Sequence, residues 1–147
     1  MNIGQPVEIL LVEDNPDDVI LTLHALRAHH LSNQVQVARD GEEALAFLFD
    51  PEKNGPHAPS GPRLILLDLK LPKLNGLEVL RQIKADPRTR SIPVVVLTAS
   101  REDRDIEVCY ALGANSYIVK PVDFEQFTRT VHTLGLYWLL LNQGPES

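Results

Sequence analysis

Five polar residues in this sequence each stand where an apolar run ends, and together they offer groups that could do chemistry. In chain order they are Glu13, Asp14, Asp68, Thr98 and Lys120. The set contains three carboxylates, one hydroxyl and one ammonium group. Mg²⁺ is commonly held by one or two carboxylates together with water and phosphate oxygens. If the fold gathers these residues, they predict a cation site beside a hydroxyl and an amine.

Gathering the carboxylates has an electrostatic cost that the sequence must offset. Two like charges ~4 Å apart repel by about 4 kcal/mol at an effective dielectric constant near 20. Three carboxylates therefore need cations nearby, or one of them must take up a proton. Lys120 supplies one positive charge, and a divalent ion such as Mg²⁺ would supply two more. On this interpretation Glu13 and Asp14 hold a metal beside Asp68.

The elements that must position these residues are predicted from the alternation of apolar runs and helical patterns. Strands are expected at 8–12, 35–38, 64–67, 94–97 and 116–119, and helices at 16–29, 40–49, 76–85, 100–113 and 123–141. Such alternation implies right-handed crossovers and a parallel sheet covered on both faces. The predicted fold class is α/β, doubly wound. Residues 50–62 hold four prolines and two glycines, which predicts a surface loop inserted into one domain.

In open α/β sheets, ligands bind beyond the carboxyl ends of the strands, so the five residues are expected at one edge. Each also has a simpler interpretation. Asp68 alone could cap a helix, and Glu13 and Asp14 could form the acidic first turn of a helix. Thr98 could be a structural turn residue, and Lys120 could be a solvated surface lysine. Their joint position at the ends of four strands favours a common site.

The motifs around these residues resemble the receiver domain of two-component response regulators. They are "LLVEDNPDD", "LILLDLKLPKLNGLEVL", "IPVVVLTAS" and "GANSYIVKPVD". The resemblance spans residues 7 to about 134. It implies a flavodoxin-like fold with five parallel strands in the order 2-1-3-4-5. The whole chain, 1–147, would be one receiver domain with a C-terminal extension at 135–147.

The resemblance also implies roles for individual residues. Asp68 would be the phosphoacceptor, which attacks the phosphohistidine of a sensor histidine kinase. Asp14 and Asp68 would bind Mg²⁺ directly, Glu13 largely through water, and Lys70 through its backbone carbonyl. The catalysis would be limited to the protein's own phosphorylation and autodephosphorylation, so it would not be an enzyme acting on another substrate.

Three further roles concern the phosphorylated state. Lys120 would pair with Asp68 at rest and with a phosphoryl oxygen afterwards. The hydroxyl of Thr98 would take another oxygen, assisted by the backbone N–H of Ala99. Tyr117 stands at the family's switch-aromatic position and would turn inward as Thr98 moves.

Lys70 departs from the commonest pattern of the family, which has a small or amide side chain two residues after the phosphoacceptor. A long cation there could shield the acyl phosphate from water. We therefore expect slow autodephosphorylation.

The composition limits which binding partners and which cellular compartment are expected. The formal charge of −6 argues against non-specific binding of nucleic acid, which needs a basic face. No apolar run reaches ~18 residues, and the N-terminus lacks the pattern of a secretory signal. The single Cys109 suits a reducing compartment, so a cytoplasmic location is expected.

The C-terminal part suggests how a signal would leave the domain. Only a short tail follows the receiver motifs, so a stand-alone regulator that acts through protein contacts is expected. The last helix is expected to carry one apolar stripe at helical spacing, formed by Phe124, Phe127, Val131, Leu134, Trp138 and Leu141. Its final turns add Leu136, Tyr137, Leu139 and Leu140, and this excess of apolar surface predicts an interface. We expect a homodimer through the helix at 100–113, the strand at 116–119 and the last helix. Alternatively, the end of the last helix folds back on its own domain.

The long loop at 50–62 and the stretch "YWLL" resemble the stand-alone regulators paired with bacterial phytochromes. Three other functions compete. A Mg²⁺-dependent phosphohydrolase would carry a second acid where Lys70 stands. A flavin-binding protein would carry a glycine-rich phosphate loop where "EDNPDD" stands. The third is a phosphorylation-independent, dimeric interaction module, which has no reason to keep all five site residues.

Overall fold

The structure is a computed structural model of the 147-residue chain. It describes residues 8–28, 34–49, 62–120, 125–126 and 129. The predicted loop at 50–62, except Pro62, lies outside the described residues. So does the predicted last helix, except residues 125, 126 and 129, and with it the C-terminal extension.

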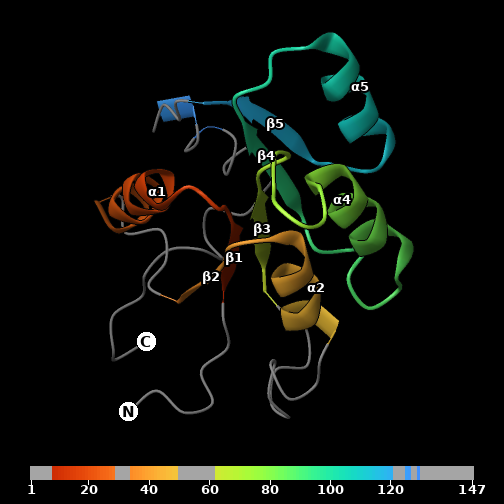
Figure 1. Ribbon diagram of the computed structural model, residues 1–147, viewed down its shortest axis with the longest axis horizontal. Helices are drawn as coiled ribbons and strands as arrows, with labels where there is room; N and C mark the ends of the chain where they lie inside the picture. Colours follow the sequence, from red (N-terminus) through yellow and green to blue (C-terminus); the bar gives the residue numbers. More distant parts are fainter. Residues whose placement is uncertain (1–7, 29–33, 50–61, 121–124, 127–128, 130–147) are drawn as a thin grey trace.

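The described strands form one parallel sheet (Figure 1). They are β1 (Ile9–Val12), β2 (Val35–Ala38), β3 (Leu64–Leu67), β4 (Val94–Thr98) and β5 (Ser116–Val119). Their order is β2-β1-β3-β4-β5, and every neighbouring pair is parallel. This confirms the predicted α/β, doubly wound class and the strand order 2-1-3-4-5.

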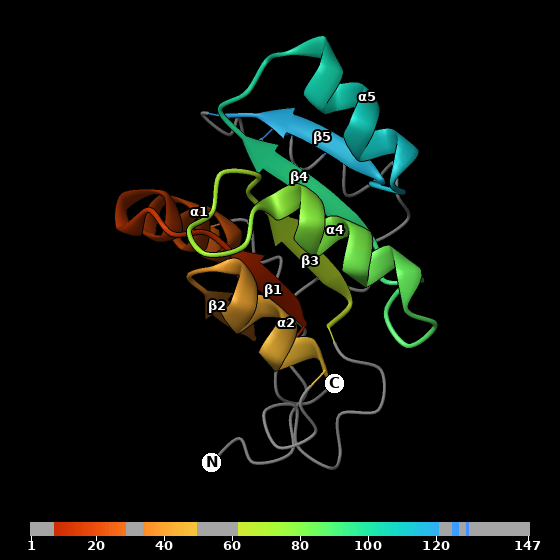
Figure 2. The same cartoon turned by 45° about the vertical axis from the view of Figure 1, so that its right-hand side comes forward.

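Helices cover both faces of the sheet (Figure 2). Within the described ranges they are α1 (Pro16–Ala28), α2 (Gly41–Phe49), α4 (Gly76–Ala85) and α5 (Asp103–Ala111). On one face, Leu10 and Val12 of β1 belong to a buried cluster with residues of α2, α4 and α5. On the other face, Ile9 and Leu11 belong to a second cluster with residues of α1. This explains the continuous apolar strands, because successive side chains point to opposite faces and both faces are buried.

Side-chain caps fix where three of these helices begin. The carboxylate of Asp40 accepts a hydrogen bond at 2.7 Å from the backbone N–H of Glu43, in the first turn of α2. Asn75 caps α4 in the same way through the N–H of Glu78. Asn15 accepts from two N–H groups in the first turn of α1. These caps satisfy donors that a helix cannot satisfy itself.

The helix expected to begin at Ser100 instead begins at Asp103. The hydroxyl of Ser100 donates to the carboxylate of Asp105 at 2.6 Å and accepts from the N–H of Glu102 at 3.3 Å. Ser100 therefore organises the loop that precedes α5 rather than serving as its cap. None of the helices in the described ranges combines the length and apolar character needed to cross a bilayer.

The hydrogen-bond ladder extends one residue beyond several strand ends. The N–H of Glu13 donates to the carbonyl of Ala38 at 2.9 Å, and that of Asp68 to the carbonyl of Val12 at 3.0 Å. The N–H of Lys120 donates to the carbonyl of Thr98 at 2.8 Å. The polar residues that follow the strands are therefore fixed by backbone contacts at the same edge of the sheet.

Candidate functional site

The first feature of this edge is a cluster of carboxylates at the ends of β1 and β3. Glu13, Asp14 and Asp68 each offer one carboxylate oxygen, and these oxygens all lie within 4.8 Å of one another. Glu13 and Asp68 are buried, with 3% and 7% of their surfaces exposed, whereas Asp14 is exposed. The cluster forms because β1 and β3 are neighbours in the sheet, with Val12 paired to Leu67.

Lys120, which follows β5, reaches into this cluster. Its ammonium nitrogen lies 3.1 Å from Oδ2 of Asp68 and 3.0 Å from Oδ2 of Asp18, and it also contacts Oε1 of Glu13. Only 14% of the Lys120 side chain is exposed. Lys120 therefore shares one positive charge among three carboxylates.

Asp18 is a member of this arrangement that the sequence reasoning missed. Val19, the next residue, is buried against the sheet, which places Asp18 at the margin of the inward face of the helix. In the sequence, only the position of Asp18 immediately before the apolar Val19 could have indicated that its side chain lies near the site.

Burial and neighbouring charges shift the protonation equilibria of two of these groups. Burial raises the pKa of Glu13 from 4.5 to about 7, with the Lys120 ammonium opposing the shift and the Asp68 carboxylate adding to it. Burial alone would lower the pKa of Lys120, but contacts with Glu13, Asp18 and Asp68 outweigh it and hold that pKa above its ordinary value. Lys120 is therefore protonated at neutral pH, and the site has a shortage of positive charge.

Thr98 and Tyr117, the two residues expected to move on phosphorylation, lie on the neighbouring strands β4 and β5. Thr98 is fully buried at the end of β4, the strand between those that carry Asp68 and Lys120. The phenol of Tyr117, on β5, donates to the backbone carbonyl of Ser100 at 3.0 Å. Tyr117 is thereby connected to the loop that begins at Thr98.

The loop after Asp68 is held closely against its surroundings. The backbone N–H of Lys70 donates to Oδ1 of Asp68 at 3.2 Å, while the Lys70 side chain is exposed. At Gly76 a Cβ atom would lie 2.3 Å from the carbonyl oxygen of Asp68, so only glycine permits this approach. Lys73 has a left-handed φ of 68° and forms a 3.4 Å ion pair with Asp40.

The residues present fit a hard divalent cation. Carboxylate oxygens are the ligands that such ions prefer, and Glu13, Asp14 and Asp68 bring three of them together. The structure thus brings together the five residues that the sequence singled out, with Thr98 lying between the strands of Asp68 and Lys120.

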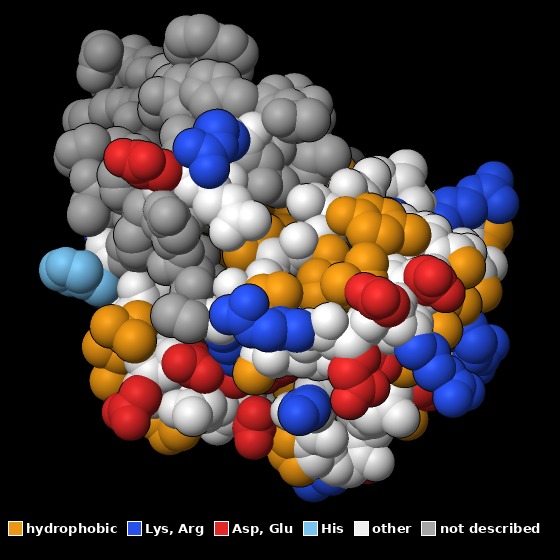
Figure 3. Space-filling view, turned by 90° about the horizontal axis from the view of Figure 1, so that it is seen from above, with side chains coloured by type: hydrophobic (Ala, Val, Ile, Leu, Met, Phe, Trp, Pro, Cys, Tyr) orange, Lys and Arg blue, Asp and Glu red, His pale blue; other side chains and the backbone are white. Residues whose placement is uncertain are grey.

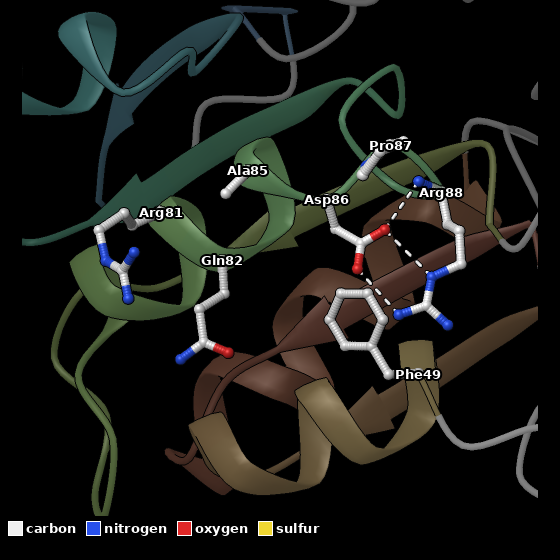
Figure 4. Close-up of a pocket in the computed structure, with 7 residues that line it drawn as sticks. All are labelled: Phe49, Arg81, Gln82, Ala85, Asp86, Pro87 and Arg88. Carbon is white, nitrogen blue, oxygen red and sulfur yellow. Dashed lines mark hydrogen bonds and ion pairs between the residues drawn. The ribbon is translucent and has the colours of Figure 1, made fainter.

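A separate shallow pocket lies at the C-terminal end of α4 (Figure 4). The ring of Phe49 stacks under the guanidinium of Arg88 at 4.9 Å, and Arg88 also forms an ion pair with Asp86. Arg81, which also lines the pocket, forms an ion pair with Glu78. Each charged side chain of this pocket thus has an ion-pair partner, and none of the five predicted site residues lines the pocket.

A model of the response regulator receiver domain matches residues 9–132 of the chain. The chain belongs to this family. The match covers the strands, the described helices and all the residues of the acidic edge, so the resemblance expected from the motifs is confirmed.

Individual receiver proteins are similar along almost the whole chain. The probable methanogenesis regulatory protein FilR2 of Methanothrix harundinacea is 45% identical over 140 residues, covering 95% of this chain and 88% of FilR2. Response regulator Rcp1 of Synechocystis is 39% identical over 135 residues, covering 91% of this chain and 90% of Rcp1.

Solved structures of receiver proteins agree with the fold. The bacteriophytochrome response regulator AtBRR has a TM-score of 0.80 at 50% identity, covering 95% of this chain and 99% of AtBRR. The Mn²⁺-bound form of Rcp1 has a TM-score of 0.71 at 38% identity, covering 91% of this chain and 95% of that one. The receiver domain described here is therefore related to response regulators of phytochromes.

Proposed function

We propose that this receiver domain accepts a phosphoryl group on Asp68 from the phosphohistidine of a sensor histidine kinase. The observation that carries the proposal is the environment of the Asp68 carboxylate. Oδ2 lies 3.1 Å from the ammonium of Lys120, Oδ1 accepts the backbone N–H of Lys70 at 3.2 Å, and two more carboxylates lie within reach of a shared cation. Phosphoryl transfer needs this combination of a positioned nucleophile and neutralised charge.

In the proposed reaction, a carboxylate oxygen of Asp68 attacks phosphorus and the P–N bond to the donor imidazole breaks. The electron pair of that bond leaves with the imidazole nitrogen. The ammonium of Lys120 and the hydroxyl of Thr98 would each stabilise one oxygen of the transferred group. Asp68 gains no proton at any step, because its oxygen becomes part of the acyl phosphate.

A divalent cation, Mg²⁺ in our proposal, would neutralise charge on the phosphoryl oxygens. Asp14 and Asp68 would bind it directly, Glu13 largely through water, and Lys70 through its backbone carbonyl. The clustered carboxylates support this assignment, and the relative Rcp1 has been solved with Mn²⁺ bound.

The switch would begin at Thr98. A phosphoryl group adds about −1.5 to −2 charges and strong acceptor oxygens beside this hydroxyl. Thr98 and Ser100 are close in the chain, and the N–H of Ser100 donates to the Thr98 hydroxyl oxygen at 3.4 Å. Movement of Thr98 would therefore disturb the carbonyl of Ser100, to which the phenol of Tyr117 is bonded. Tyr117 would then turn inward, changing the surface of β5.

We propose a phytochrome as the sensor kinase. The support is the similarity to Rcp1 and AtBRR, each covered over at least nine-tenths of its length. Because the match extends over nearly the full length of these relatives, we propose a stand-alone regulator that does not bind nucleic acid. The described surface in Figure 3 carries acidic and basic side chains side by side rather than one basic patch. The lone Cys109 and the net charge of −6 suit a cytoplasmic protein.

The output would be a contact between proteins, including a homodimer through α5, β5 and the predicted last helix. Tyr110 on α5 supports this surface, because 48% of this large side chain is exposed. Sedimentation at increasing concentrations would show a rise in mass if the dimer forms. A monomer mass that does not depend on concentration would exclude the dimer.

The phosphotransfer itself is tested by intact-mass measurement after incubation with acetyl phosphate. We expect one added phosphoryl group, which requires Mg²⁺ and is absent in Asp68→Asn. Asp17→Asn removes an exposed acid that lies outside the carboxylate cluster, so this variant should be labelled like the wild type. No added mass under conditions that label another receiver would instead favour a phosphorylation-independent, dimeric interaction module.

A further inference from the structure

Two overlapping groups of carboxylates occupy the acidic edge. The group suited to a cation consists of Glu13, Asp14 and Asp68. The group that holds the ammonium of Lys120 consists of Glu13, Asp18 and Asp68. Glu13 and Asp68 thus belong to both groups, and Asp18 is the member that contacts only the lysine.

Asp18 is held in place by the start of α1. The side-chain oxygen of Asn15 accepts the N–H groups of Asp17 and Asp18 at 2.9 and 3.3 Å, and Pro16 begins the helix. Val19 anchors the same turn because it is buried against the sheet. From this fixed backbone, the Asp18 carboxylate reaches the Lys120 ammonium at 3.0 Å, with 34% of its side chain exposed.

A cation and Lys120 would compete for the shared carboxylates. A divalent ion bound by Asp14 and Asp68, and by Glu13 largely through water, would attract the negative charge of Glu13 and Asp68 and would itself repel the ammonium. Two of the three ion pairs of Lys120 would therefore weaken when the ion binds. The pair with Asp18 would remain, because Asp18 lies outside the cation group.

We propose that Asp18 is a positioning residue that retains Lys120 at the site while a divalent cation occupies the cluster of Glu13, Asp14 and Asp68. This inference rests on the proposed phosphotransfer, in which Lys120 must be at the site together with the cation so that it can contact a phosphoryl oxygen. Asp18 itself does not contact the transferred group.

The first test measures how accessible Lys120 is, without any phosphodonor. The protein is acylated at its amines by an N-hydroxysuccinimide ester, and the rate at Lys120 is read by peptide mass spectrometry with and without saturating Mg²⁺. In Asp18→Asn without Mg²⁺, Glu13 and Asp68 still hold Lys120, so the rate should stay within about twofold of wild type. With Mg²⁺, the Asp18→Asn rate should exceed that of wild type by about fivefold.

Asp17→Asn is the matched control. Asp17 lies in the same turn, is capped by the same Asn15 and carries the same charge, but it is exposed and forms no ion pair with Lys120. Its acylation rates should match those of wild type in both conditions. Asp18→Glu should restore most of the protection, because it keeps the charge. Equal rates at Lys120 in wild type and Asp18→Asn at saturating Mg²⁺ would overturn the proposal.

The second test measures the rate of phosphorylation by acetyl phosphate at saturating Mg²⁺. Asp18→Asn should slow it by about threefold to fivefold in the wild-type background. It should have no further effect in Lys120→Ala, because Asp18 acts through Lys120. An equal slowing in both backgrounds would overturn the proposal.

The two tests separate this inference from the proposed function. If wild type is phosphorylated at Asp68 but Asp18→Asn matches it in both tests, the inference fails and the proposed function stands. If wild type is not phosphorylated but Mg²⁺ exposes Lys120 in Asp18→Asn alone, the positioning role stands and the proposed function fails.

Discussion

The ammonium of Lys120 lies 3.1 Å from the carboxylate of Asp68, although 52 residues separate them in the chain. The sheet order explains the contact. Strand β4 lies between β3 and β5, so Lys120 reaches across the end of β4, where Thr98 is buried. The nucleophile, the ammonium and the hydroxyl of the proposed reaction are thus positioned by three adjacent strands.

Lys120→Met should destabilise the fold, because it leaves the buried carboxylates of Glu13 and Asp68 without their cation. We expect a loss of about 2–3 kcal/mol in the free energy of unfolding at pH 7, measured by urea denaturation. Added Mg²⁺ should restore part of this loss. Lys70→Met, which removes an exposed cation nearby, should change stability by less than about 0.5 kcal/mol. Equal unfolding midpoints for Lys120→Met and wild type would contradict the interpretation.

Lys70→Ala should shorten the lifetime of the acyl phosphate. The exposed Lys70 side chain follows Asp68 closely, and its own N–H is bonded to the Asp68 carboxylate. Removing the long cation should give water easier access to phosphorus, so autodephosphorylation should accelerate by about twofold to fivefold. The measurement is the decay of the phosphorylated mass after removal of the donor, with Lys73→Ala as control. An unchanged lifetime in Lys70→Ala would exclude the shielding role.

Gly76→Ala should be strongly destabilising. The added Cβ would lie 2.3 Å from the carbonyl oxygen of Asp68 and 2.5 Å from Cα of Leu69, and both neighbours are backbone atoms that cannot rotate away. We expect a loss of at least about 3 kcal/mol, measured by thermal or urea unfolding. Ala85→Gly, a change of the same size in the same helix, should cost only about 0.5–1 kcal/mol. A Gly76→Ala protein as stable as wild type would show that the loop after Asp68 is less closely packed.

Cys109 should react slowly with thiol reagents. Burial raises the pKa of its thiol to about 11, and the negative charge of Asp105 adds to the shift. A raised pKa leaves less thiolate, so the alkylation rate at pH 8 should be about a hundredfold below that of an unfolded chain. The rate should keep rising with pH beyond 9 as thiolate forms. Iodoacetamide labelling with and without urea checks this, and a rate equal to that in urea would contradict it.

Much of the fold and site could be predicted from the sequence because the signals are local. Apolar runs marked the strands, and residues such as Asp68 and Lys120 stood at their ends, which a parallel sheet brings to one edge. The helix expected at 40–49 is α2, which Asp40 caps. The strand order came from the resemblance to the receiver family rather than from these patterns.

The features that were missed depend on contacts between distant segments. The pairing of Asp18 with Lys120 joins residues 102 apart, and no local pattern encodes it. The ion pair of Lys73 with Asp40 likewise joins two loops. The helix expected at 100–113 begins late, at Asp103, because the side chain of Ser100 is bonded to Asp105 and organises a loop before it.

Locating the phosphorylated residue would show whether Asp68 is the phosphoacceptor. After incubation with acetyl phosphate and Mg²⁺, borohydride reduces an aspartyl phosphate to homoserine, and peptide mass spectrometry then locates the converted residue. We expect homoserine at position 68 in the wild type, and at no position when Mg²⁺ is omitted. Homoserine at Asp14 or Asp18 instead, or no conversion in a protein that has gained the phosphoryl mass, would contradict this assignment.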